Sequence, residues 1–377
     1  MLSHARKSVP TSSNIPPLLR FIIMATSQPI HPSSTIRSVM AVSYELPASK
    51  APLTFGRVLS PGHIVVAAHL QASGLHHRLQ DYIKSAAFHL KTLWLFIADD
   101  AKTIAPTWLC FALIHATNLS QFGTAPLPIS TLLPRLPRIT TWVLLHLLMH
   151  DIGNQRRPTS VLEDTLNKPW RPMPAGRISA PAACTLHTIC QLTACIFCLR
   201  FGGLAAHLTI LALSHVYNDP RGASHSWALR NLINGFGNIA YGYGALEVAV
   251  GSEHSLMTPQ LASWLCILGL AISSSSHIQD LKDQVGDAAA GMRTVPLVYG
   301  DAAARWSLVV ALVAWTAACC GIWATSLAAS VGPVLAAAIV VYRLLSWRQA
   351  SEGRVTQKIW HAWILALYLV SAMNCLA

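Results

Sequence analysis

The sequence predicts an all-α integral membrane protein with about nine transmembrane helices. Three observations predict this fold class. Of the 377 residues, 53% are hydrophobic, and the mean hydropathy is +0.44. Only 11% are charged, against roughly 25% in a typical soluble domain, which is too few to cover a water-soluble core of this size. Apolar runs of roughly 17–25 residues, the length that crosses a bilayer, recur along the chain.

Residues 1–85 differ in composition from the rest of the chain. They are rich in Ser, Pro and His, and no acidic residue precedes Glu45. We expect a disordered, basic N-terminal tail here, followed by a transmembrane domain over residues 86–377. A transit peptide has a similar composition and is the alternative, although no amphipathic Arg-rich helix stands out.

The remaining chain contains apolar runs that we expect to form membrane-spanning helices. Their predicted ranges are 104–119, 139–155, 179–199, 203–218, 231–250, 259–279, 305–323, 328–346 and 359–376.

The positions of the basic residues support this division. With nine spans, 24 of the 27 Lys and Arg residues fall on the side of the N-terminal tail, and only Arg135, Arg138 and Arg200 fall on the other. Such a bias is typical of a cytosolic membrane face. The net charge of +12 therefore reflects topology, and no interleaved aromatic and basic stretch indicates nucleic-acid binding. No feature predicts a protein partner.

Nine cysteines lie within or beside the apolar runs. Cys195 and Cys198 have Cys-x-x-Cys spacing, but no thioredoxin-like strand precedes them. We expect all nine to be small apolar helix residues.

Six of the fifteen acidic residues lie in two short segments at the cytosolic ends of predicted spans. Carboxylates at such positions are costly and indicate function. In the second segment, Asp280, Asp283 and Asp287 are spaced i, i+3 and i+7, which places all three on one face of a helix. Adjacent carboxylates repel one another, and their hard oxygen atoms suit Mg²⁺.

The first acidic segment follows the second predicted span. Asp151, Asn154 and Gln155 share a helix face, and Pro158 is expected to end that helix. A Pro-rich loop then presents acidic, amide and basic side chains: Glu163, Asp164, Asn167, Lys168 and Arg171. Carboxylates that hold Mg²⁺ beside bases that donate to phosphate oxygens fit a metal-bridged diphosphate. An ordinary cytosolic loop is the simpler interpretation, which the pairing with the second segment disfavours.

A third region, from Tyr217 to Glu247, carries further polar groups and four glycines. The polar side chains expected to reach the same cytosolic cavity are Tyr217, Asn218, Arg230, Asn231 and Asn234. No strand precedes the glycines at 235, 237, 242 and 244, so a dinucleotide site is disfavoured, and close helix contact is the better interpretation.

The two acidic segments resemble those of the UbiA superfamily of intramembrane prenyltransferases. The resemblance rests on residues 167–172 (Asn-Lys-Pro-Trp-Arg-Pro) and on residues 280–296, which follow the second and sixth predicted helices. It extends from about Leu93 to the C-terminus. The first segment departs from the common form, because Pro158 stands four residues after Asn154 and the pair Glu163-Asp164 comes later. This form is similar to a fungal branch that includes membrane-bound terpene cyclases.

The resemblance implies a UbiA-like catalytic domain, with its helices around a central cavity that opens to the cytosolic side. It implies Mg²⁺ as cofactor, an isoprenoid diphosphate as substrate, and contact with membrane lipid. The expected catalytic residues are Asp164, Asp280, Asp283 and Asp287. The expected metal ligands are Asn154, Glu163, Asp164, Asp280, Asp283 and Asp287. The expected diphosphate-binding residues are Asn154, Lys168, Arg171, Asn231 and Arg293.

The function implied by this branch is a terpene cyclase of secondary metabolism that acts on farnesyl or geranylgeranyl diphosphate. An aromatic prenyltransferase is the main alternative, and a membrane transporter is disfavoured because no internal repeat is evident. Aromatic faces stabilise carbocations, and the candidates are Phe111, Trp142, Tyr217, Phe236, Tyr241 and Tyr243. The endoplasmic reticulum is the expected membrane, or the mitochondrial inner membrane if the tail is a transit peptide.

Overall fold

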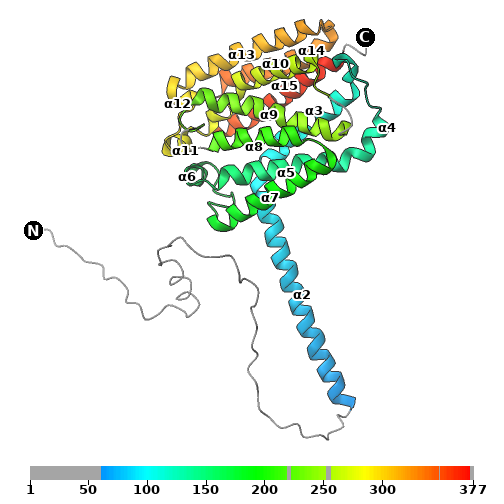
Figure 1. The fold of residues 1–377 in the computed structure, drawn as a ribbon. Helices are drawn as coiled ribbons and strands as arrows, with labels where there is room; N and C mark the ends of the chain where they lie inside the picture. Colours follow the sequence, from blue (N-terminus) through cyan, green and yellow to red (C-terminus); the bar gives the residue numbers. More distant parts are fainter. Residues whose placement is uncertain (1–60, 219–221, 252–255, 348, 374–377) are drawn as a thin grey trace, which may run out of the picture. The chain divides into compact units, whose positions relative to one another are not determined.

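The structure is a computed structural model that describes residues 61–218, 222–251, 256–347 and 349–373. All regular elements in these ranges are helices, and no strand occurs there, so the predicted all-α fold is confirmed (Figure 1). The described residues from Leu70 onward form one compact unit.

Each of the nine predicted spans falls on a helix of the described chain. These helices are α3 (Ile104–Thr117), α5 (Leu136–Gln155), α7 (Ala180–Phe201), α8 (Leu204–Asn218), α9 (Trp227–Val250), α10 (Pro259–Ser275), α13 (Asp301–Ile322), α14 (Leu327–Ser346) and α15 (Ala350–Met373). Four described segments are long and apolar enough to cross a membrane, namely Ala180–Phe201, Pro259–Lys282, Asp301–Ile322 and Leu327–Ser346. Nine membrane crossings therefore stay a prediction.

Helix α2 (Pro61–Ile97) precedes the first predicted span. The boundary expected at residue 86 lies inside this helix, while residues 1–60 of the expected tail lie outside the described part. The end of α2 is fastened by Arg177, whose guanidinium donates to the carbonyl of Phe88 and to Oγ1 of Thr92, both at 3.1 Å.

Short helices lie between the long ones. A small α4 (Ile129–Leu132) precedes α5. Helix α6 (Pro158–Asn167) follows α5 directly, so the prediction of a loop here is wrong. Pro158 stops α5 but also begins α6, because its fixed φ suits the first turn of a helix, where no N–H donor is needed.

The second acidic segment is also shaped differently from the prediction. Two 3₁₀ turns, Ser276–Ile278 and Asp280–Lys282, precede the short helix α11 (Gln284–Ala289), and α12 (Val295–Tyr299) follows. The three aspartates therefore do not share one face of a continuous helix. Tight 3₁₀ turns change the direction of each successive side chain relative to the α-helical period.

Helix α9 lies among α3, α5, α8 and α10 and contacts all four. Its glycines allow this, as predicted. A Cβ on Gly235 would lie 2.4 Å from the carbonyl oxygen of Gly269 in α10, and one on Gly244 would lie 2.2 Å from the Trp142 ring in α5. Small residues let helix backbones approach closely in a membrane. Gly237 differs, because nothing lies within 4 Å of its Cβ position.

Candidate active site

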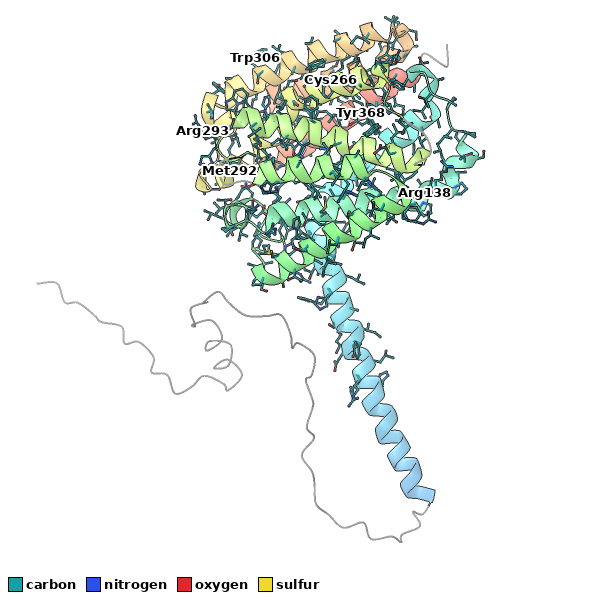
Figure 2. All side chains as sticks on the ribbon, viewed as in Figure 1. Arg138, Cys266, Met292, Arg293, Trp306 and Tyr368 are labelled. Atoms are coloured by element: carbon teal, nitrogen blue, oxygen red, sulfur yellow. The ribbon has the colours of Figure 1, made fainter. Side chains whose placement is uncertain are left out.

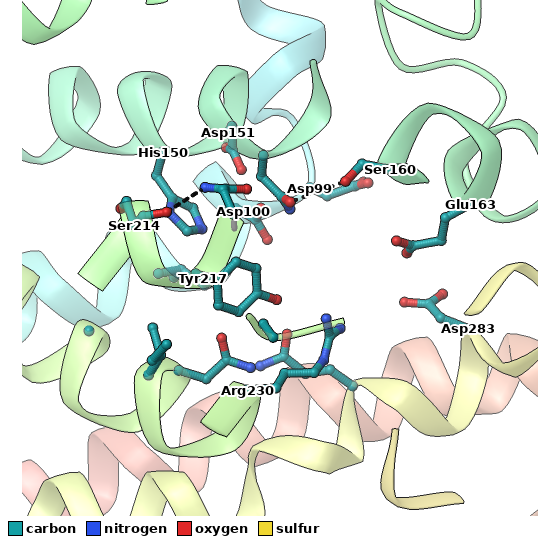
Figure 3. Close-up of a pocket in the computed structure, with 18 of the residues that line it drawn as sticks. Asp99, Asp100, His150, Asp151, Ser160, Glu163, Ser214, Tyr217, Arg230 and Asp283 are labelled. Atoms are coloured by element: carbon teal, nitrogen blue, oxygen red, sulfur yellow. Dashed lines mark hydrogen bonds between the residues drawn. The ribbon is translucent and has the colours of Figure 1, made fainter. Parts of the chain in front are cut away.

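A cavity of about 670 Å³ lies among the helices where the two acidic segments meet. Its lining residues come from α3, α5, α6, α8 and α9, the segment between α10 and α12, and the start of α15. Figure 3 shows part of this lining, with charged side chains from three different parts of the chain converging on one space. Pockets of this volume commonly bind small molecules.

The first acidic segment supplies one wall. Asn154 and Glu163 line the cavity, and Oδ1 of Asn154 accepts a hydrogen bond from the Ser160 hydroxyl at 3.4 Å. This bond crosses the junction between α5 and α6 and holds the amide at the cavity surface.

Asp164 does not line the cavity. It is only 1% exposed, and its two carboxylate oxygens accept hydrogen bonds from Nη1 of Arg171 at 3.0 and 3.1 Å. Burial alone would lower the pKa of Arg171, but Asp164 and two further aspartates raise it, so the guanidinium stays charged at the cavity wall. In this structure Asp164 therefore binds Arg171, and it does not face the cavity as its expected role as a metal ligand would require.

The two acidic segments are joined by Asn167. Its Nδ2 donates to the carbonyl of Asp283 at 2.9 Å, and its Oδ1 accepts from the backbone N–H of Gly286 at 3.1 Å. Gly286 is required here, since a Cβ would lie 2.3 Å from Nδ2 of Asn167. The next residue, Lys168, is thereby placed with its Nζ 3.6 Å from Oδ2 of Asp283.

Of the three aspartates in the second segment, Asp283 is the one that lines the cavity. It points toward Glu163, as Figure 3 shows. Burial alone would raise the pKa of Asp283, but Lys168 and Lys282 lower it below its ordinary value. Asp283 is therefore a carboxylate at neutral pH, available beside Glu163 at the mouth of the cavity.

Asp280 and Asp287 lie behind this wall. Oδ1 of Asp280 accepts from Nη2 of the cavity-lining Arg230 at 3.1 Å, while its Oδ2 is buried without a partner. Asp287 is fully buried, and neither of its oxygens has a hydrogen-bond partner. Burial raises the pKa of Asp287 to about 8, and Arg230 offsets only part of this shift.

Buried carboxylate oxygens without partners are costly, and a cation is the usual compensation. Asp280 and Asp287 supply such oxygens, and Glu163 is close enough to interact with Asp287 electrostatically. These hard oxygen donors fit a divalent cation such as Mg²⁺.

Two expected diphosphate-binding residues do not line this cavity. Asn231 lines a separate groove between α9, α10 and α13. Arg293 is exposed, and Figure 2 places it at the end of the helices near α12. The sequence indicated the end of each helix at which these residues lie, but it could not show which face of each element meets the cavity.

Several cavity residues were not foreseen. Asp99 and Asp100 line it from the short connection between α2 and α3, and Arg354 and Lys358 line it from α15. Burial alone would raise the pKa of Asp100, but Arg171 lowers it below its ordinary value. Two adjacent acids before the first span, in a chain with only fifteen, were a signal that pointed to this pair.

The deeper part of the cavity is aromatic and apolar. The rings of Trp108 and Tyr241 are stacked 4.1 Å apart, and Nε1 of Trp108 donates to Oδ1 of Asn238 at 2.9 Å. Tyr217 also lines the cavity, as expected, whereas Trp108 was not foreseen. The other expected aromatic residues do not line this cavity: Phe111, Trp142, Phe236 and Tyr243.

Comparison with known sequences adds an independent finding. The profile of the UbiA prenyltransferase family matches residues 157–370, more than half of the chain. The fumagillin beta-trans-bergamotene synthase of Aspergillus fumigatus is 29% identical over 236 residues, which cover 62% of this chain and 75% of that protein. The polyprenyl transferase eriF of Hericium erinaceus is 29% identical over 210 residues, which cover 52% of this chain and 65% of that protein, just under two thirds.

Among solved structures, the apo structure of a UbiA homolog from Aeropyrum pernix K1 matches with a TM-score of 0.50 at 18% sequence identity. The match covers 72% of this chain and 96% of that one. At this identity the similarity concerns the fold.

The first testable prediction concerns Asp287. Because the folded-state pKa is about 8 and an unfolded aspartate titrates near ~3.9, the folded protein binds more protons between these values. Without divalent cations, stability should therefore fall as the pH rises through this window. Added Mg²⁺ should raise the unfolding midpoint by a few degrees at about pH 8.5 and less at about pH 5.5. Thermal unfolding in detergent measures both effects.

Asp287→Asn is the matched variant. It should unfold at a higher temperature than the native chain at about pH 8.5 without Mg²⁺, because the buried charge is gone. It should also lose most of the Mg²⁺-dependent rise. A variant that keeps the full rise would contradict a role for Asp287 in cation binding.

A second prediction separates the two roles of Asp164. If Asp164 acts by holding Arg171, then Asp164→Asn and Arg171→Ala should each weaken binding of inorganic pyrophosphate, and the double variant should bind no worse than Arg171→Ala. The loss for Arg171→Ala should be about 10- to 100-fold, because hydrogen bonds to charged groups contribute about 1.5–3 kcal/mol. Titration calorimetry with Mg²⁺ present measures the affinities.

The control for this cycle is Arg177→Ala, since Arg177 lies in the same loop but contacts α2 instead of the cavity. It should leave pyrophosphate affinity unchanged. Additive losses for Asp164→Asn and Arg171→Ala would assign Asp164 an independent contact with the ligand or its metal.

Proposed function

Because this chain belongs to the UbiA prenyltransferase family, we propose that it is a Mg²⁺-dependent, membrane-bound terpene cyclase. Its substrate would be a linear isoprenoid diphosphate, farnesyl or geranylgeranyl diphosphate, and its product a cyclic terpenoid of secondary metabolism. The alternative is an aromatic prenyltransferase. Residues 86–377 are the proposed catalytic domain. The proposed location is the endoplasmic reticulum membrane, or the mitochondrial inner membrane if the N-terminal residues are a transit peptide.

The observation that carries this proposal is the division of one cavity into a charged mouth and an aromatic, apolar interior. Helices α5 and α8 end at the mouth, so their earlier residues Leu147, Ile210 and Leu213 line the deeper part. Helices α3 and α9 begin at the mouth, so Trp108 and Tyr241 lie deeper as well. Such a cavity matches a molecule with a diphosphate head and a hydrocarbon chain.

Three cations at the mouth would bind the diphosphate oxygens. Lys168, Arg171 and Arg230 each line the cavity and each pair with a carboxylate, namely Asp283, Asp164 and Asp280. The pairs hold the cations in place before substrate arrives, so little reorganisation is needed as charge develops on the leaving pyrophosphate. Lys282, Arg354 and Lys358 add positive charge around the same mouth.

The carboxylates Glu163, Asp280, Asp283 and Asp287, with Asn154, would hold the metal. Asp99 and Asp100 are further carboxylates at the same mouth. Bound Mg²⁺ neutralises charge on the diphosphate and on departing pyrophosphate. Glu163 and Asp283 point toward one another, which brings the two acidic segments within reach of one substrate head group.

Ionisation breaks the allylic C–O bond, releases pyrophosphate and leaves a positive charge on the hydrocarbon chain. In a cyclase, a double bond of the same chain attacks the cation, and loss of a proton ends the reaction. The stacked Trp108 and Tyr241 rings offer aromatic faces for the cation, and the surrounding Leu and Ile side chains exclude water. The relative named as a bergamotene synthase supports this choice.

The transferase alternative has its own support. Asn234 and Ser214 also line the cavity and could orient an acceptor hydroxyl. The relative named as a polyprenyl transferase has the same identity to this chain. In a cyclase the cation is attacked by a double bond of the same substrate, and in a transferase it is attacked by the aromatic acceptor. The two reactions therefore give different products, which distinguish them.

The decisive experiment uses microsomes that contain the protein. We expect farnesyl or geranylgeranyl diphosphate with Mg²⁺, and without any acceptor, to give a cyclic hydrocarbon or alcohol by GC–MS, and EDTA to abolish it. Microsomes with Asp283→Ala are the matched control and should lose at least about 100-fold in activity. Product formation only after an aromatic acceptor is added would replace the cyclase by the transferase.

A further prediction concerns Gly237, which lines the cavity with open space at its Cβ position. Gly237→Leu should fill part of the interior without disturbing helix contacts. The ratio of kcat/KM for geranylgeranyl over farnesyl diphosphate should fall about tenfold or more, since each misplaced methylene costs about 1–3 kcal/mol. Gly321→Leu is the control, because Gly321 in α13 also has open space but lies away from the cavity. An unchanged ratio in Gly237→Leu would mean that the hydrocarbon chain of the substrate does not reach the cavity wall at Gly237.

A further inference from the structure

A second cluster of metal-binding side chains lies deeper in the membrane domain than the cavity. It consists of His146 in α5, Cys198 in α7 and His207 in α8, whose ligand atoms all lie within 4.8 Å of one another. Each of the three residues is at most 2% exposed, and none of them lines the cavity. The cluster begins where the cavity lining ends, since Leu147 is the neighbour of His146.

The distances in the cluster are close to those of a tetrahedral metal site. Nε2 of His146 lies 3.0 Å from Nδ1 of His207 and 3.9 Å from Sγ of Cys198. Zinc bonds of about 2.05 Å to nitrogen and 2.3 Å to sulfur, at tetrahedral angles, separate two nitrogens by about 3.3 Å and nitrogen from sulfur by about 3.6 Å. These two distances differ from zinc geometry by about 0.3 Å each, and Nδ1 of His207 lies within 4.8 Å of Sγ of Cys198, so a small movement of the side chains would place all three atoms around one ion.

The protonation of the His146 ring also suits coordination of a metal ion. Its Nδ1 lies 2.8 Å from the carbonyl oxygen of Trp142, and a carbonyl can only accept, so Nδ1 carries the proton. The lone pair of Nε2 therefore points at the other two residues. A backbone carbonyl on the second ring nitrogen is a common way to orient a metal-binding histidine.

Two polar neighbours lie beside Cys198. The indole N–H of Trp142 is within hydrogen-bonding reach of the cysteine sulfur, and Glu247 is close enough to interact with it electrostatically. Glu247 also pairs with the Tyr243 hydroxyl, while its Oε2 is buried and makes no hydrogen bond. The indole N–H is a donor suited to a thiolate. A thiolate and one carboxylate would cancel the charge of a divalent ion, which matters in a low-dielectric interior.

We propose that His146, Cys198 and His207 bind a structural zinc ion that fastens α5, α7 and α8 together beneath the cavity. Two imidazole nitrogens and a thiolate are ligands typical of zinc, and Glu247 or a water molecule supplies the fourth position. The proposal gives Cys198 a role beyond that of the small apolar residue expected from the sequence. The site is separate from the Mg²⁺ site in both position and ligand type.

The test starts with the full-length protein, purified in detergent through a tag without histidines and without added metal. Elemental analysis should find about one zinc per chain in the native protein. Cys198→Ser should lose at least about tenfold of the zinc. Cys190→Ser is the matched control, because Cys190 is also buried in α7 but belongs to no cluster, and it should keep the metal.

A spectroscopic arm removes the dependence on folding of the variants. Native protein expressed with Co²⁺ should show a thiolate-to-cobalt charge-transfer band that Cys190→Ser keeps and Cys198→Ser lacks. Native protein with no zinc and no cobalt band would overturn the proposal and leave His146 and His207 as a hydrogen-bonded pair beside a thiol. Zinc that Cys198→Ser and His207→Gln both retain would overturn it as well.

Discussion

The amide of Asn167 joins two parts of the chain that are more than a hundred residues apart. One side chain donates to the carbonyl of Asp283 and accepts from the N–H of Gly286, so both of its polar groups are satisfied by α11 and the turn before it. A protein interior tolerates few unpaired polar groups, so this pair of hydrogen bonds defines the register between the two segments. Lys168, Arg171 and Glu163 take their positions from the same helix α6 and its end.

Charge pairing then decides what the cavity can bind. Lys168, Arg171 and Arg230 are each held by a carboxylate, and breaking one such pair would leave an uncompensated charge away from water. The pairs do not use all the carboxylate oxygens. Both oxygens of Asp287 and one oxygen of Asp280 lack partners in the described chain. The site thus combines fixed positive charge with unpaired carboxylate oxygens, as the proposed binding of a diphosphate and a cation requires.

The helices around the site depend on close contacts of small residues. Gly244 makes room for the Trp142 ring, and Trp142 in turn stacks on His146 at a centroid distance of 3.8 Å. Gly242 makes room for Phe111 of α3 in the same way. Because these contacts hold α9 against α3 and α5, the open space left at Gly237 persists as part of the cavity. The same tight contacts surround the proposed zinc ligands, so the middle of α5 would hold the zinc while its C-terminal turns line the cavity.

The sequence by itself determined the class of fold, the helix positions and the two acidic segments. Hydropathy and the side on which Lys and Arg gather are properties of consecutive residues, so each predicted span falls on a helix without knowledge of its neighbours. Only the tertiary structure decided which face of each element meets the cavity. It turned Asn231 toward another groove, exposed Arg293, brought in Asp100 and Trp108, and placed Cys198 beside two histidines. Such contacts join residues far apart in the chain, and their partners are chosen by helix rotation and close approach, which local patterns do not encode.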